Sequence, residues 1–173
     1  MIKKTLIVVA VMIFAAAMFA AVNAQDAKDA KEVKHEFVGA KKCKMCHKKG
    51  GVYEGWEASA HATAFDKLDD AGKANKECAP CHTTGALADG TMLTGVECEA
   101  CHGAGADYKK KSVMEDREAA LAAGMILPTE EDCLKCHGGT FPEGHAEVAK
   151  FDFAAFLKKG VHPMPSKAEA ESK

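Results

Sequence analysis

Four copies of one cysteine–histidine pattern dominate the chemistry available to this 173-residue chain. Each copy has two cysteines separated by two residues and followed at once by a histidine, and together the copies use all eight cysteines. They read Cys43-Lys-Met-Cys46-His47, Cys78-Ala-Pro-Cys81-His82, Cys98-Glu-Ala-Cys101-His102 and Cys133-Leu-Lys-Cys136-His137. This pattern is the attachment signature of c-type haem. The thiols bond the two vinyl groups of haem, and the histidine is held beneath the iron as its proximal ligand.

Two other uses of paired cysteines have to be weighed. Zinc sites built from four cysteines use the same spacing, and exported proteins use cysteines in disulfide frameworks. Neither alternative explains a histidine directly after every second cysteine. The sequence therefore predicts four covalently bound haem c groups, with His47, His82, His102 and His137 as proximal iron ligands.

The elements that must position these motifs are expected to be mainly α-helical, with long loops. After residue 24 the aromatic residues are one Trp, two Tyr and six Phe, although a chain of this size buries roughly 70 % of its unfolded surface. The sequence thus predicts a multihaem cytochrome c fold in which the haems form the core. The expected elements are a helix over 54–68, a helix from Ser112 to Gly124, a cap at 128–132 leading into the fourth motif, a helix over 152–159, and a loop or weak strand over 83–95.

The first 24 residues have the pattern of a cleaved signal peptide. Lys3 and Lys4 precede an uncharged run, and Val22-Asn23-Ala24 supplies small residues for cleavage before Gln25. This pattern predicts a periplasmic or secreted protein with no stable membrane anchor after cleavage. The expected domains are the signal peptide over 1–24, a tetrahaem cytochrome c domain over 25–162 and a disordered tail over 163–173.

Four histidines outside the motifs are candidates for the distal iron position. His61 lies beside Phe65 in the predicted helix, and His162 follows a predicted amphipathic helix, so both are expected to be distal ligands. His35 and His145 lie in polar stretches, where a solvated histidine is the ordinary alternative. A methionine could ligate instead, and the candidates are Met92, Met114, Met125 and Met164.

The sequence resembles the tetrahaem cytochrome c-554 family. Three runs carry the resemblance: Met92-Leu-Thr-Gly-Val-Glu-Cys98-Glu-Ala-Cys101-His102-Gly-Ala-Gly105, Tyr53-Glu-Gly-Trp56-Glu-Ala-Ser-Ala-His61-Ala, and the segment from Lys150-Phe-Asp-Phe153 to His162-Pro163. The resemblance implies that His61 serves the third haem, that His162 serves the fourth, and that the second haem has an open or weakly filled sixth position.

The chain departs from the family after the third motif. The family commonly has a histidine there that ligates the first haem, whereas this chain reads Gly105-Ala-Asp-Tyr108-Lys and has no histidine before His137. The first haem could then use His35 or His145, Tyr108 or a methionine, or a ligand from another subunit, or it could stay open.

These features predict a periplasmic electron carrier rather than an enzyme. The expected partners are a quinol-linked or enzyme donor and a downstream reductase or cytochrome acceptor. One alternative is binding or reduction of a small molecule such as nitric oxide at a five-coordinate haem, and another is a subunit of a polymeric cytochrome chain. The formal net charge is -2, which does not favour nucleic-acid binding, but Lys41–Lys49 and Lys109–Lys111 are basic runs that could dock an acidic partner.

Overall fold

The structure is a computed structural model that describes residues 35–146 and 150–163. The predicted signal peptide, the candidate ligand Met164 and the predicted tail from residue 164 onward lie outside the described residues. No helix in the described ranges combines the length and the apolar character needed to cross a membrane.

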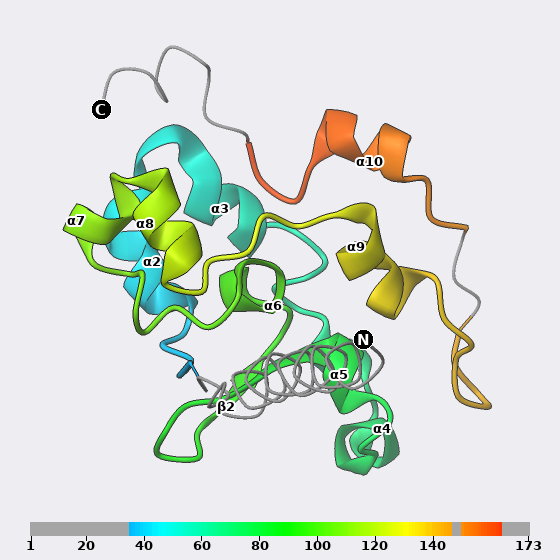
Figure 1. Ribbon diagram of the computed structural model, residues 1–173. Helices are drawn as coiled ribbons and strands as arrows, with labels where there is room; N and C mark the ends of the chain where they lie inside the picture. The colour runs from blue at the N-terminus through cyan, green and yellow to red at the C-terminus, as the bar shows by residue number, and fades with distance from the viewer. Residues whose placement is uncertain (1–34, 147–149, 164–173) are drawn as a thin grey trace, which may run out of the picture. The chain divides into compact units, whose positions relative to one another are not determined.

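Short helices joined by long turns, with one small β-hairpin, make up the described chain (Figure 1). In chain order they are α2 (Ala40–His47), η1 (Lys49–Gly51), α3 (Val52–Glu57), η2 (Phe65–Lys67), α4 (Asp70–Ala74), α5 (Ala79–His82), β1 (Thr83–Ala86), β2 (Met92–Thr94), α6 (Cys98–His102), α7 (Lys111–Met114), α8 (Arg117–Ala122), α9 (Glu130–His137) and α10 (Phe153–Lys159). The mainly α fold with long loops is therefore confirmed. Helices this short are marginal in isolation, so tertiary contacts must stabilise them.

Two of the predicted helix starts are confirmed by their caps. Thr129 and Asp132 form a reciprocal capping box that begins α9, and Asp152 caps α10 by accepting a 2.9 Å hydrogen bond from the N–H of Ala155. These side chains satisfy N–H groups that a helix start leaves without partners. The helix that carries the fourth motif and the helix before His162 thus follow from local sequence.

The predicted continuous helix over 54–68 is wrong. Helix α3 ends at Glu57, and turns lead to the short 3-10 helix η2. The carbonyl of His61 accepts a 2.9 Å hydrogen bond from the N–H of Val96, a residue distant in sequence. This tertiary contact holds the segment in turns, although its apolar spacing fits a helix.

The predicted helix from Ser112 to Gly124 is divided in two. Asp116 lies between α7 and α8 with extended backbone angles, and its side chain accepts a hydrogen bond from the N–H of Ala119. The predicted start with a cap at Ser112 is wrong, because α7 begins at Lys111 without a side-chain cap, and Asp116 caps α8, the second half. The predicted end of that half at Gly124 is confirmed, because α8 reaches only to Ala122.

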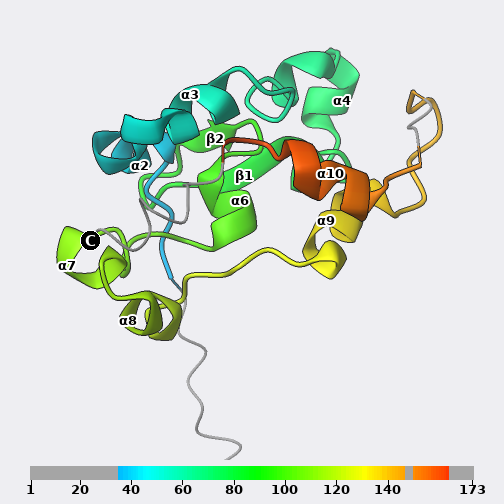
Figure 2. The same cartoon turned by 90° about the horizontal axis from the view of Figure 1, so that it is seen from above.

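The hairpin lies between the helices of the second and third motifs. Strand β1 follows α5 directly, pairs antiparallel with β2, and is irregular between Thr83 and Gly85. The prediction of a weak strand over 83–95 is confirmed. In Figure 2 the hairpin and α6 lie centrally, with α2 and α3 on one side and α9 and α10 on the other.

Large apolar side chains do not fill an interior within the described ranges. The buried hydrophobic residues there are Ala40, Tyr53, Leu93, Tyr108 and Ala120, and no large side chain among the described residues is completely buried. Protein interiors are ordinarily packed with such side chains. Their scarcity fits a fold whose apolar interior is supplied by prosthetic groups.

Candidate haem sites

Each cysteine–histidine motif lies on a helix that ends at the histidine of the motif, except that Cys78 is the N-cap residue of α5 and has helical backbone angles. Helices α2, α5, α6 and α9 end at His47, His82, His102 and His137, respectively. Residues three and four apart lie on the same face of a helix. The two thiols and the imidazole of each motif therefore share one face, as attachment to a single haem requires.

The cysteines place the four motifs in one row. The thiols of Cys43 and Cys98 lie close together and helices α2 and α6 contact each other, which joins the first motif to the third. Cys101 lies close enough to Cys133 for their charges to interact, which joins the third motif to the fourth. The thiol of Cys136 lies close to that of Cys81 and 4.0 Å from the carbonyl oxygen of Pro80, which joins the fourth motif to the second. The order in space is thus first, third, fourth, second.

All eight thiols are free of disulfides. Burial, followed by the neighbouring thiol of Cys81, raises the pKa of Cys136 to about 12, so this thiol is protonated at neutral pH. Within residues 35–146 and 150–163, no three cysteine, histidine or carboxylate side chains form a group that could hold a metal ion. The arrangement does not support the zinc or disulfide alternatives.

Three motif histidines face a histidine from elsewhere in the chain. The ring centres are 5.9 Å apart for His61 and His137, and 6.3 Å apart in each of the other two pairs. The other pairs are His82 with His145 and His102 with His162. Metal–imidazole bonds are about 2 Å long, so two imidazoles on opposite sides of one iron have ring centres about 6 Å apart. The residues present therefore fit haem iron held between two histidines.

The pairing of His61 and His162 differs from the one that the family resemblance implied. His61 faces His137 of the fourth motif, not His102 of the third, and His162 faces His102. The indole N–H of Trp56 donates a 2.8 Å hydrogen bond to the carbonyl of Val96, so the chain before His61 is tied to the segment that enters α6. This anchor determines where the turn presents the His61 ring.

His162 reaches the third motif because the C-terminal segment crosses α3 at Gly55. A Cβ atom at Gly55 would collide with the ring of Pro163 and would lie 3.1 Å from the Cα of His162. The absence of a side chain therefore permits this crossing. It brings the segment after α10 close to a helix near the start of the described chain.

Backbone carbonyls fix the orientation of four of these histidines. The Nδ1 atoms of His82 and His102 donate hydrogen bonds to the carbonyls of Ala64 (2.7 Å) and Ile126 (3.1 Å). His145 and His162 donate in the same way to the residues that follow them. Because a carbonyl only accepts, each Nδ1 carries the proton and Nε2 keeps its lone pair. This is the tautomer that binds a metal through Nε2.

Burial also favours the neutral form of two of the rings. Desolvation lowers the pKa of His61, and His137 lowers it further. Desolvation likewise lowers the pKa of His102. A neutral imidazole is the form that coordinates metal, so both environments suit a ligand.

His35 has a carboxylate partner. Its Nδ1 lies 2.6 Å from an Oδ atom of Asp107, in the stretch where the family commonly has a histidine. Tyr108 is unsuited to serve as a ligand, because its hydroxyl donates to the carbonyls of His102 and Gly103. Burial raises the pKa of Tyr108 well above its ordinary value, so the phenol stays protonated.

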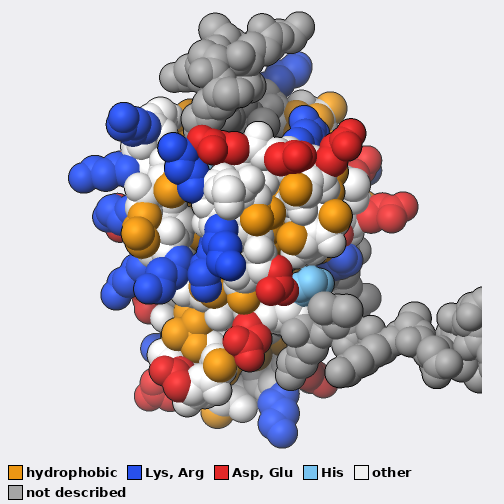
Figure 3. Space-filling view, turned by 60° about the vertical axis from the view of Figure 1, so that its left-hand side comes forward, with side chains coloured by type: hydrophobic (Ala, Val, Ile, Leu, Met, Phe, Trp, Pro, Cys, Tyr) orange, Lys and Arg blue, Asp and Glu red, His pale blue; other side chains and the backbone are white. Residues whose placement is uncertain are grey.

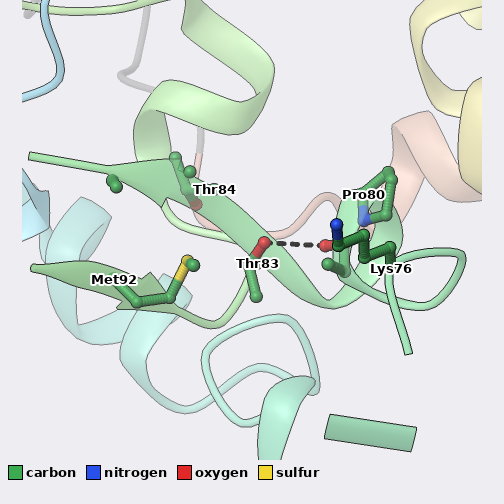
Figure 4. Close-up of a pocket in the computed structure, with 8 residues that line it drawn as sticks. Lys76, Pro80, Thr83, Thr84 and Met92 are labelled. Atoms are coloured by element: carbon green, nitrogen blue, oxygen red, sulfur yellow. Dashed lines mark hydrogen bonds between the residues drawn. The ribbon is translucent and has the colours of Figure 1, made fainter. Parts of the chain in front are cut away.

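Met92 lines a shallow surface pocket and lies apart from the motif histidines. The pocket has a volume of about 370 Å³ and includes the spacer residues Ala79 and Pro80 of the second motif (Figure 4). No motif cysteine or histidine lines it. This geometry gives no support to Met92 as an iron ligand.

Glu99 is a structural residue of the site that the sequence interpretation missed. It is the first spacer residue of the third motif and is 2 % exposed. Its carboxylate accepts hydrogen bonds from the N–H groups of Val38, Gly39 and Gly105 at 2.6–3.1 Å. It therefore ties the segment before α2 to α6. One feature of the sequence could have identified Glu99: it is a carboxylate inside a motif that is expected to be buried against haem.

The hydroxyl oxygen of Ser59, close in sequence to His61, has no hydrogen-bond partner among the described residues. This hydroxyl is buried, two positions before His61. A buried hydroxyl normally has a partner. A carboxylate of a haem held between His61 and His137 is a chemically suitable one.

A basic surface lies near the first motif. The exposed lysines are Lys41, Lys42, Lys48, Lys49, Lys109, Lys110 and Lys111. They belong to α2, α7 and the adjoining turns, which lie on the same side of the described chain in Figures 1 and 2. Figure 3 shows Lys and Arg side chains gathered over that side.

Comparisons with known proteins bear on the same arrangement. Residues 42–103 match the family described as cytochrome c554 and c-prime. The chain is 31 % identical over 167 residues to cytochrome c-554 of Nitrosomonas europaea, covering 76 % of this chain and 68 % of that protein. The structure of the reduced state of cytochrome c554 from Nitrosomonas europaea matches with a TM-score of 0.50 and 24 % identity, over 74 % of this chain and 79 % of that one. The structural match supports the fold.

Proposed function

The chain belongs to the cytochrome c-554 family, and from that premise we propose that it is an exported tetrahaem electron carrier. Membership makes it a c-type cytochrome with covalently bound haem and an electron-carrier role among redox proteins. The residues of this chain support four haems, their iron ligands, a periplasmic location and a class of partner.

The row of motifs is the observation that carries the proposal. Cysteines of neighbouring motifs lie near one another in the order first, third, fourth, second, so neighbouring haems would be close together. When bound, haem iron gains and loses single electrons at a potential set by its ligands and surroundings. A continuous row of such groups suits conduction from one end of the chain's fold to the other.

The chain's own residues would hold these groups in a low-potential form. Eight cysteines would anchor four haems, with His47, His82, His102 and His137 as proximal ligands. His61 would complete the fourth site and His162 the third, as their ring pairs indicate. We assign His35 to the first haem, because Asp107 holds its ring in the stretch where the family commonly has the ligand of that haem, and a carboxylate on Nδ1 orients a metal-binding histidine. Imidazole ligands on both sides give lower potentials than methionine ligands.

Export and partners follow from other features. The predicted signal peptide over 1–24 and the attachment of haem c outside the cytoplasm both support a periplasmic location for the domain over 25–162. The donor would be a quinol-linked protein or an enzyme, and the acceptor a downstream reductase or cytochrome. The basic surface near the first motif suits an acidic partner.

The proposal is tested on the purified, exported protein. Its intact mass should correspond to a chain that begins at Gln25 and carries four haems. After anaerobic reduction, mixing with hexacyanoferrate(III) should reoxidise all four haems, and nitric oxide should not be consumed catalytically. Fewer than four haems would contradict the tetrahaem assignment, and turnover of nitric oxide with an electron donor would contradict the carrier assignment.

A further inference from the structure

We propose that His145 is the sixth ligand of the second haem and closes an iron site that the family resemblance implied to be open or weakly filled. The inference rests on the proposed tetrahaem carrier and goes beyond it, because it concerns access of small molecules to one iron. His82, the proximal histidine of the second motif, faces His145 with ring centres 6.3 Å apart. The pair His102–His162 has the same spacing.

Both rings are oriented for metal binding through Nε2. His82 donates from Nδ1 to the carbonyl of Ala64, and His145 donates from Nδ1 to the carbonyl of Ala146, each at 2.7 Å. The proton on each ring is therefore on Nδ1, and the opposite nitrogen keeps its lone pair. A histidine that was merely solvated at the surface would have no reason to carry its proton on the same nitrogen as His82, the ring that it faces.

The turn that carries His145 is shaped to present it. The ring of Phe141 stacks on His145 with centres 4.5 Å apart and an interplanar angle of 21°. The N–H of His145 donates a 3.1 Å hydrogen bond to the carbonyl of Pro142, which closes the turn. Gly144 has a φ of 85°, a left-handed conformation that other residues adopt with strain. Stacking, hydrogen bond and glycine together limit the directions in which the imidazole can point.

A six-coordinate second haem changes what the chain can do. An iron with two imidazole ligands has no vacant position for nitric oxide, carbon monoxide or oxygen. The second haem lies at one end of the row of motifs, joined to the rest by the contact between Cys81 and Cys136. Closing it makes this end a site of electron exchange rather than of small-molecule reduction.

The test compares the holoprotein with the variant His145→Gly and with the control Glu143→Gln on the same turn. Ferric electron paramagnetic resonance should show one additional high-spin haem per chain in His145→Gly, and the reduced variant should bind one additional carbon monoxide per chain. Adding free imidazole should restore the low-spin spectrum, which a purely structural role of His145 would not allow. Glu143, an exposed residue, can be replaced without either change.

The outcome that overturns the inference is equally specific. Equal carbon monoxide stoichiometry in the wild type and in His145→Gly would show that His145 does not occupy the sixth position. The mass of each holoprotein distinguishes this failure from failure of the proposed function. Four haems with unchanged ligand binding would refute only the role of His145, whereas fewer than four haems would refute the tetrahaem assignment itself.

Discussion

The backbone N–H of Gly39 donates a 2.7 Å hydrogen bond to the buried carboxylate of Glu99. The same carboxylate accepts from Val38 and Gly105, while the neighbouring Glu97 accepts a 2.6 Å hydrogen bond from the N–H of Ala40. These contacts join the start of α2 to α6, the two helices that carry the neighbouring thiols of Cys43 and Cys98. Two acidic side chains thus set the spacing between the first and third motifs.

Replacing Glu99 with Gln should destabilise the folded protein. The amide nitrogen cannot accept a hydrogen bond, so at least one buried N–H among those of Val38, Gly39 and Gly105 loses its partner. Leaving a buried donor unsatisfied costs about 1–3 kcal/mol. The midpoint of denaturant unfolding of the holoprotein should fall accordingly, as measured by circular dichroism.

The matched control for this change is Glu77→Gln. Glu77 lies directly before the second motif, whereas Glu99 lies inside the third, and Glu77 is exposed. Its replacement should leave the unfolding midpoint unchanged within a few tenths of a kcal/mol. Equal midpoints for Glu99→Gln and Glu77→Gln would show that the contacts of Glu99 do not stabilise the fold.

Gly55→Ala should open the third haem without weakening helix α3. Alanine is favoured over glycine within a helix by about 1 kcal/mol, but its Cβ would collide with Pro163. The segment that carries His162 would have to move away from His102. We expect one new high-spin haem per chain by electron paramagnetic resonance and additional carbon monoxide binding after reduction.

A second glycine supplies the control for that experiment. A Cβ at Gly139 would have no heavy atom within 4 Å. Gly139→Ala should therefore leave the haem spectra unchanged. If Gly55→Ala also retains a fully low-spin spectrum, the crossing at Gly55 does not hold His162 in place.

The local parts of the site could be predicted from the sequence, because they depend on neighbouring residues. The spacing within each motif is enough to place two thiols and a histidine on one helical face, and the caps at Thr129 and Asp152 mark the starts of α9 and α10. The distal histidines are different. Which iron His61 serves depends on the hydrogen bonds of Trp56 and His61 to Val96, and these cannot be inferred from spacing along the chain.

The mistaken helix over 54–68 has a related cause. Helical spacing is present at His61, Ala64, Phe65 and Leu68. The carbonyl of Ala64, however, accepts a hydrogen bond from the ring of His82. The segment therefore provides backbone acceptors to a motif histidine and to Val96. Apolar periodicity records which residues face away from solvent, and these four residues are half-buried in turns, so the pattern did not distinguish turns from a helix.

The pairing of His61 with the fourth motif can be tested by removing one haem at a time. In a background lacking the fourth attachment site (Cys133→Ala and Cys136→Ala), His61→Ala should add no new carbon monoxide binding. In a background lacking the third site (Cys98→Ala and Cys101→Ala), the same change should open one further iron. The opposite pattern would restore the pairing implied by the family resemblance. Wild-type attachment with His61→Ala alone serves as the reference.

Asp107→Asn should raise the reduction potential of one haem. A carboxylate that accepts the Nδ1 proton of a ligand histidine makes the imidazole a stronger donor, which stabilises ferric iron. The neutral amide of Asn accepts this proton more weakly, so it stabilises ferric iron less. Haem-resolved spectroelectrochemistry should show one midpoint shifted upward and the others unchanged, and His35→Ala should open the same iron to carbon monoxide. If all four midpoints match those of the wild type, His35 is not the ligand of the first haem.

The lysines near the first motif should accelerate reaction with anionic oxidants. Lys48 and Lys49 are exposed directly after α2, whereas Lys158 and Lys159 form an equally charged, exposed pair at the end of α10. Replacing the first pair with Glu should slow oxidation of the reduced protein by hexacyanoferrate(III) several-fold at low salt, because the surface no longer attracts the anion. The difference should vanish near 1 M salt, where the Debye length is about 3 Å. Lys158→Glu with Lys159→Glu is the control of identical net charge, and an equal loss of rate in both variants would show that net charge, not this surface, governs the reaction.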